Sequence, residues 1–177
     1  DGKVISVEGA IAPNVGGIVG SFFGSNDENN KAVLAGCINN GNVQSMSVSS
    51  NCGGIVGMAS TGKADATIDN CFNYALVSTA EGGAGGIIGL ASAANELTLN
   101  VMACVNYGQV NSGTELTDYV GGIIGSTSPW GGKIHIEGCR NEADLSGPEC
   151  AGISAVVVTI ENGVFECIDC VNIGDIT

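Results

Sequence analysis

The sequence is poor in basic residues, histidine, proline and aromatic side chains. It holds 5 Lys and Arg against 18 Asp and Glu, with 1 His, 3 Pro and 5% aromatic residues among 177 positions. The resulting net charge of −13 repels phosphate backbones and anionic lipids, which excludes nucleic acid as a partner. No apolar run approaches the roughly 20 residues of a membrane-spanning helix, so we expect no direct membrane insertion.

The shortage of histidine removes most catalytic groupings. A His-Glu-x-x-His zinc site needs two histidines, and the sequence has only His135. A serine triad would depend on the same residue, and no Gly-x-Ser-x-Gly elbow occurs. The basic residues that could neutralise a uronate substrate are scattered along the chain: Lys3, Lys31, Lys63, Lys133 and Arg140. We therefore expect a protein that is not an enzyme and has no cofactor and no metal site.

One hydrolytic alternative stays open, a β-helix glycoside hydrolase. Such an enzyme needs two carboxylates about 5 to 10 Å apart. The candidates are Glu142, Asp144 and Glu149, or the adjacent pair Asp27 and Glu28. In sequence these residues resemble solvated loop charges, so this alternative requires a groove that gathers them.

Glycine, in contrast, is abundant and marks an internal repeat. A Gly-Gly-aliphatic-aliphatic-Gly block occurs at 16–20, 53–57, 85–89 and 121–125, and in a decayed form at 151–155. A Cys-x-Asn block follows each one, at 37–39, 71–73, 104–106, 139–141 and 170–172, and is itself followed by a small and then an aliphatic residue. We divide the single repeat domain, residues 1–177, into a partial unit 1–15 and units of about 16–52, 53–84, 85–120, 121–150 and 151–177.

Alternation inside each unit predicts strands. Apolar residues lie three and five positions before each repeat Cys, with a mostly polar or β-branched residue between them, as in Leu99-Asn100-Val101. A change of phase just before the Cys predicts a bend at small or turn-tolerant residues, namely Gly36, Asn70, Ala103, Gly138 and Asp169. Each unit then has three short strands: the Gly-Gly block, the run to the Cys and the run after the Asn.

We predict an all-β fold, a right-handed parallel β-helix or β-solenoid with about five coils of three short strands. At about 4.8 Å per coil, it would be roughly 24 Å long. A β-propeller-like repeat is the alternative, but blades usually need four strands and an aromatic signature. No capping segment is recognisable, so we expect a fragment of a longer chain, with flanking domains as neighbours and any targeting segment removed. Caps too short to recognise are the other possibility.

Cysteine and asparagine form two repeat columns. Five of the 8 cysteines hold one position, Cys37, Cys71, Cys104, Cys139 and Cys170. Cys52, Cys150 and Cys167 replace aliphatic or small residues of other units, so we favour free thiols, with some disulfide bonding as the alternative. The pair Cys167 and Cys170 has redox or metal spacing, although the repeat accounts for each Cys separately.

The second column, Asn39, Asn73, Asn106, Asn141 and Asn172, predicts a structural amide ladder in preference to a ligand site.

Aromatic side chains supply the weak candidates for ligand binding. Tyr74 and Tyr107 occupy one outward position in neighbouring units, and Trp130 lies in a Pro-Trp-Gly-Gly loop. The tyrosines could stack against a sugar ring or simply protect a sheet, and Trp130 could make a contact or cover the core.

The Gly-Gly-Ile-Val-Gly block followed by Cys-x-Asn-x-Gly-x-Val resembles the GLUG-type repeats of bacterial cell-surface proteins. These include accessory regions of immunoglobulin-cleaving metallopeptidases. The resemblance runs from about Gly16 to Ile176 and implies display outside the cell. We therefore expect a non-catalytic, extracellular stalk or adhesin that contacts a host glycan or a surface protein. A carbohydrate-binding module using Tyr74, Tyr107 and Trp130 is the alternative.

Overall fold

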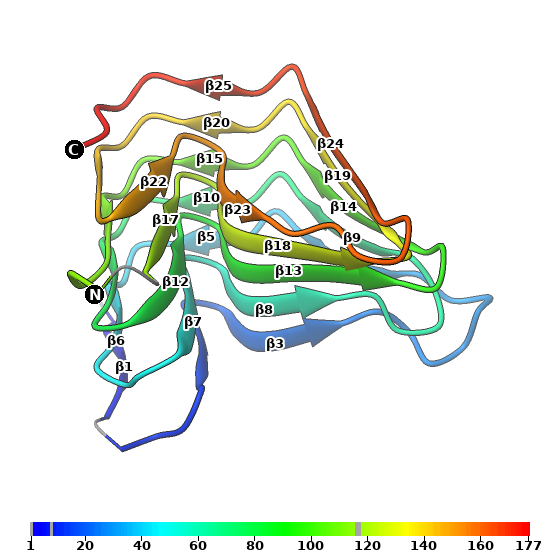
Figure 1. The fold of residues 1–177 in the computed structure, drawn as a ribbon, viewed down its shortest axis with the longest axis horizontal. Coiled ribbons are helices and arrows are strands. Elements are labelled where there is room, and N and C mark those ends of the chain that lie inside the picture. The colour runs from blue at the N-terminus through cyan, green and yellow to red at the C-terminus, as the bar shows by residue number, and fades with distance from the viewer. Residues whose placement is uncertain (1, 8, 116–117) are drawn as a thin grey trace.

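The computed structural model describes residues 2–7, 9–115 and 118–177, and its regular elements there are all β-strands. These strands form five sheets of five parallel strands, and hydrogen-bonded neighbours come from successive turns of the chain (Figure 1). The predicted β-solenoid is therefore confirmed, and the propeller alternative is wrong. Within the described ranges, no helix is long and apolar enough to cross a membrane.

We label the sheets A to E in the order in which the chain visits them. Sheet A contains β1 (Val4–Ser6), β6 (Val43–Ser45), β11 (Val77–Thr79), β16 (Val110–Asn111) and β21 (Leu145–Ser146). Sheet B contains β2 (Asn14–Gly16), β7 (Ser50–Gly53), β12 (Gly82–Gly85), β17 (Tyr119–Gly121) and β22 (Glu149–Ala151). Sheet C contains β3 (Val19–Phe23), β8 (Val56–Ser60), β13 (Ile88–Ala94), β18 (Ile124–Trp130) and β23 (Ser154–Val157).

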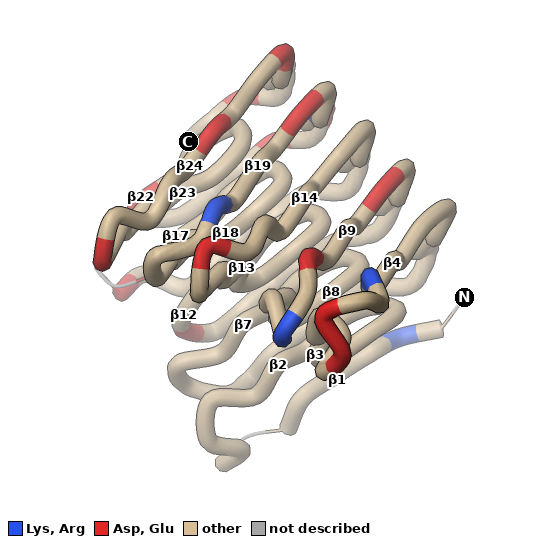
Figure 2. Tube along the Cα trace, turned by 90° about the vertical axis from the view of Figure 1, so that its right-hand side faces the viewer, with Lys and Arg blue, Asp and Glu red and all other residues tan. Residues whose placement is uncertain are grey.

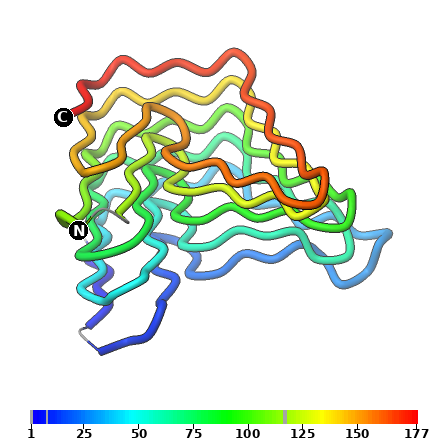
Figure 3. The backbone as a smooth tube through the Cα atoms, viewed as in Figure 1, coloured from blue at the N-terminus to red at the C-terminus, as the bar shows by residue number. Residues whose placement is uncertain are grey.

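Sheet D contains β4 (Ala32–Ala35), β9 (Ala66–Asp69), β14 (Thr98–Met102), β19 (Lys133–Glu137) and β24 (Val164–Ile168). Sheet E contains β5 (Ile38–Asn39), β10 (Phe72–Asn73), β15 (Val105–Asn106), β20 (Arg140–Asn141) and β25 (Val171–Asn172). The coils follow nearly the same path and stack from the N-terminal to the C-terminal side of the molecule (Figure 3).

Each coil has five short strands, which corrects our expectation of three. The Gly-Gly block is not a strand, because the chain bends at its second glycine and separates a strand of sheet B from a strand of sheet C. The run after the Cys is also divided, since a corner follows the Asn and separates sheet E from sheet A. Hydrophobic alternation does not reveal the corner after the Asn, because inward and outward positions keep their order across it. At the Gly-Gly corner the order is broken, since consecutive residues such as Ile55 and Val56 are both buried.

The bend before each repeat Cys is a left-handed residue in every coil, as the change of phase predicted. Gly36 and Gly138 have φ of 66° and 62°, and Asn70, Ala103 and Asp169 have φ of 50°, 49° and 50°. Glycine adopts this conformation without a steric penalty and asparagine or aspartate tolerates it, whereas Ala103 adopts it at a cost. The bend therefore belongs to the fold of the coil, because it persists where the residue disfavours it.

The interior has two separate hydrophobic clusters. One lies between sheets C, D and E and includes Ile88, Leu99 and Cys104, and the other lies between sheets A and B and includes Val77 and Val110. Between them the chain is pinched, because the second glycine of each block lies against the Asn of its own coil. A Cβ added at Gly54, for example, would come within 2.5 Å of the Asn73 Cγ atom. The Gly-Gly block and the Cys-x-Asn block of one coil therefore meet at a narrow part of the coil, which we call the waist. Glycine is required there because a side chain would collide with the Asn.

Candidate functional site

The asparagine column is a continuous hydrogen-bonded ladder through the waist. The side-chain amide of each Asn donates to the Oδ1 atom of the Asn in the next coil, at 2.8 Å for Asn39, Asn73 and Asn106 and 2.7 Å for Asn141. Each amide also donates to the carbonyl two residues later in its own coil, including that of Asn172 to Gly174. With both amide hydrogens used in the inner coils, the ladder holds the fold and has little capacity for a ligand.

The cysteine column lies inside the larger cluster, and all eight cysteines are free thiols. Cys71, Cys104 and Cys139 are buried, and their Sγ atoms approach backbone carbonyls of their own and the preceding coil. Burial raises the pKa of Cys52, in the smaller cluster, to about 12. A protonated, enclosed thiol such as that of Cys52 is a poor nucleophile. The buried cysteines of the column pack in the larger cluster as small apolar groups.

Cys167 lies on β24, whereas Cys170 lies between β24 and β25, after the left-handed Asp169. Cys167 continues the column of Ile136, as predicted, yet it is exposed because β24 is the edge strand of sheet D. Burial is the largest cause that raises the pKa of Cys170, to about 12. Within the described ranges, no group of three His, Cys, Asp or Glu residues could hold a metal ion.

His135 belongs to a surface ion cluster on sheet D. Its Nδ1 atom lies 3.1 Å from Glu166 Oε2, and its Nε2 atom lies 3.1 Å from Glu137 Oε2. Lys133 Nζ lies 2.7 Å from the same Glu166 oxygen, and this contact, followed by that of His135, lowers the pKa of Glu166. Acidic residues recur along this side of the solenoid (Figure 2). Lys133 offsets some of that charge. Among the described residues, the side-chain partners of His135 are these two glutamates, and no serine is among them.

Tyr74 and Tyr107 stack on each other on the outside of the corner between sheets E and A. Their ring centroids are 4.8 Å apart and their planes differ by 6°, so each ring uses one face against the other. The rings remain 52% and 40% exposed, respectively. Glu142, at the same repeat position in the next coil, pairs with Arg140 at 2.7 Å. Because each ring covers one face of the other, the pair is not a broad flat platform.

Trp130 does not join the tyrosines. It ends β18, on the opposite side of the coil from the carboxyl ends of β10 and β15 that precede the tyrosines (Figure 1). Its indole N–H donates to Ser128 Oγ at 2.6 Å, and the side chain is 49% exposed. The expected combined Tyr and Trp face is therefore not formed, because about half a coil separates its members.

The carboxylates proposed for a glycosidase are not gathered in one groove. Glu142 pairs with Arg140, Asp144 Oδ1 accepts the Asp175 backbone N–H at 3.1 Å, and Glu149 lies on sheet B. Asp27 is in a loop, where bonds from the Asn29 backbone and side chain lower its pKa. These carboxylates therefore lie in separate places on the coil and do not form the pair that a glycosidase requires.

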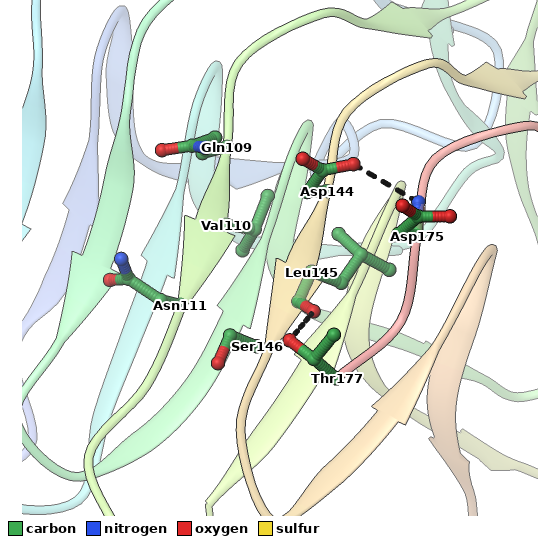
Figure 4. Close-up of a pocket in the computed structure, with 8 residues that line it drawn as sticks. All are labelled: Gln109, Val110, Asn111, Asp144, Leu145, Ser146, Asp175 and Thr177. Carbon is green, nitrogen blue, oxygen red and sulfur yellow. Dashed lines mark hydrogen bonds between the residues drawn. The ribbon is translucent and has the colours of Figure 1, made fainter.

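The outer face of sheet A carries a shallow, polar groove. One hollow of about 280 Å³ is lined by Gln109, Asn111, Asp144, Ser146 and Asp175, among others (Figure 4). A second hollow of about 450 Å³ lies beside Gln44, Ser78 and Asn111, on the coils before it. Because Asn111 lines both hollows, they form one surface that crosses several coils.

Of these groove residues, sequence reasoning selected only Asp144, and as a glycosidase candidate. The alternation after each Cys does place Gln109 and Asn111 outward, on either side of the inward Val110. It contains no sign that outward residues of separate coils border a hollow, because that depends on side-chain length in neighbouring coils.

Comparison with solved structures gives a bacterial neighbour. A structure described as a "putative immunoglobulin A1 protease" from Bacteroides ovatus superposes with a TM-score of 0.65 at 24% sequence identity. The match covers 97% of this chain and 47% of the other, so the chain spans about half the length of its neighbour. No family model and no curated protein matches the chain, so the GLUG-type resemblance stays a prediction. The comparison therefore shows a shared fold.

Proposed function

We propose that this chain is a non-catalytic, extracellular repeat module of a bacterial surface protein, acting as a stalk or adhesin in contact with a protein or host surface. The observation that carries the proposal is the contrast between inward and outward columns. Five coils keep one inward Asn, whereas the outward position beside it varies completely in chemistry: Asn40, Tyr74, Tyr107, Glu142 and Ile173. A constant interior with a variable outer surface suits a protein that presents binding surfaces better than an enzyme that turns over one substrate.

Other features support the same function. The neighbour of this fold is a bacterial protein about twice as long as the matched region. The net charge of −13 favours solubility and discourages nonspecific contact with anionic membranes. The groove of sheet A lies on the side of the solenoid, where a stack of coils can present it to a partner.

An adhesion experiment tests this proposal. Beads coated with the protein should be retained on mucin-covered epithelial layers more strongly than beads coated with heat-unfolded protein. Incubation with the same surface should release no sugar or peptide. Equal retention of both bead types would refute the adhesin role and leave a spacer role, and release of fragments would refute the non-catalytic assignment.

A further inference from the structure

The groove on sheet A holds several polar side chains that could bond to a ligand. Among the described residues, the side chains of Gln44, Ser78, Gln109, Asn111 and Ser146 make no hydrogen bond to protein. The amides each supply two donors and a carbonyl acceptor, and the hydroxyls both donate and accept. These groups are complementary to the hydroxyls of a sugar, which also donate and accept.

Apolar contacts border the same groups. Leu76 and Met46 line the second hollow, and Met46 is 46% exposed. Tyr107 lies two residues before Gln109, at the corner where sheet A begins. Sugars present C–H groups as well as hydroxyls, so a groove that mixes amides with isolated apolar side chains suits them. A protein partner would call for a cluster of large buried anchors, whereas the apolar side chains of this groove are interspersed with amides and hydroxyls.

The repeat sets the direction of the ligand. Gln44, Ser78, Asn111 and Ser146 occupy one column, because their strands pair in register across sheet A. Successive members are about 4.8 Å apart, so this column and the coil beyond it extend over roughly 19 Å. An extended oligosaccharide that lies along the solenoid axis can meet one polar side chain in each coil.

The negative charge at the groove favours neutral over anionic sugars. Asp144 and Asp175 stand at one end of the groove, and no Lys or Arg lines either hollow. Carboxylates accept hydrogen bonds from neutral hydroxyls but repel uronate, sialate and sulfate groups, and the chain as a whole is strongly acidic.

We propose that the outer face of sheet A is a binding site for a neutral oligosaccharide that lies along the solenoid axis and bonds to Gln109, Asn111 and Ser146. The proposal rests on the adhesin function and names its ligand class. It moves sugar recognition away from Trp130 and makes Tyr107 a border of the site.

Calorimetry tests the site directly. The protein is titrated with neutral hexaoses of glucose, mannose, galactose and N-acetylglucosamine, and with a galacturonate hexaose as the anionic comparison. At least one neutral hexaose should bind with an affinity that is the same at low and high salt, and the galacturonate should not bind. Asn111→Ala should weaken that binding about three- to tenfold, and Gln109→Ala/Asn111→Ala/Ser146→Ala by at least about thirtyfold.

Asn100→Ala is the matched control. Asn100 is a half-buried, outward residue on β14 of sheet D, and it lines neither hollow. It should leave the affinity unchanged, and circular dichroism should show all variants folded. The site is refuted if no neutral hexaose binds at millimolar concentration, if Asn111→Ala binds as tightly as Asn100→Ala, or if only galacturonate binds. Beads that adhere to mucin while every hexaose fails would overturn the sugar site alone and point to a protein partner. Beads that fail to adhere would overturn the adhesin function.

Discussion

Replacing the central asparagine of the ladder should destabilise the solenoid strongly. The Asn106 side chain donates to Gly108 O at 2.9 Å and Asn141 Oδ1 at 2.8 Å, and it accepts from Asn73 Nδ2 at 2.8 Å and Gly108 N at 3.2 Å. Four buried hydrogen bonds at about 0.5 to 1.5 kcal/mol each give a loss of about 2 to 6 kcal/mol for Asn106→Ala. Since a domain has only about 5 to 15 kcal/mol of stability, the urea midpoint should fall sharply.

The assay is urea unfolding followed by circular dichroism, with Asn100→Ala as the control. Asn100 is outward on sheet D, so its loss should change the free energy of unfolding by less than about 0.5 kcal/mol. If Asn106→Ala and Asn100→Ala have the same midpoint, the ladder contributes no stability and the argument from buried amides fails. Asn106→Asp provides a pH test, because burial raises the pKa of the new carboxyl in the folded state. That variant should be more stable near pH 4 than near pH 7, since stability is lost as the pH rises above the unfolded value.

Three further predictions follow from other contacts. A Cβ at Gly86 would overlap Gly122 O and Asn106, so Gly86→Ala should cost at least about 3 kcal/mol in urea unfolding, whereas Gly83→Ala, with its nearest atom at 3.3 Å, should cost less than about 1 kcal/mol. The Lys133 contact lowers the pKa of Glu166, so this pair stabilises the fold above about pH 4.5 and loses its effect as the pH falls through the lowered pKa of the folded state. Lys133→Met should raise the pKa of Glu166 in an NMR titration, and an unchanged pKa would refute the contact. A thiol reagent should label the exposed Cys167 in the native protein and the buried thiols only after unfolding, and uniform labelling would contradict the burial pattern.

The repeat pattern predicted the solenoid because the same inward residues, Cys and Asn, recur in every unit, as expected when the units stack as successive coils. Ala103 illustrates this, since its place in the repeat indicated a bend that its residue type alone would not suggest. The five-strand course could not be predicted, because the corner after the Asn preserves the alternation and the Gly-Gly block is too short to show a change of direction. Equally, the sequence could not show that Gly54 and Asn73 meet across a waist, since nothing local couples residues 19 positions apart.

The candidate site was less predictable than the fold. The stack of Tyr74 and Tyr107 followed from their shared position, but the place of Trp130 depended on the shape of the coil. Asp118 gives the same lesson for a buried polar group. It reads as an ordinary loop charge, yet it is fully buried and accepts the backbone N–H groups of Gly82 and Glu115 at 2.7 and 3.1 Å. Its role depends on a turn contributed by the preceding coil.

The amide ladder also determines how the solenoid responds to tension. Its bonds, like those of the five sheets, point along the stacking axis, so a pulling force loads each coil boundary along its own hydrogen bonds. Boundaries arranged in series fail one at a time, beginning with the weakest. Each failure would release one coil, which is 33 residues between Asn73 and Asn106, or about 115 Å of extended chain. A tether of this kind lengthens in discrete steps and limits the peak force that reaches whatever it holds.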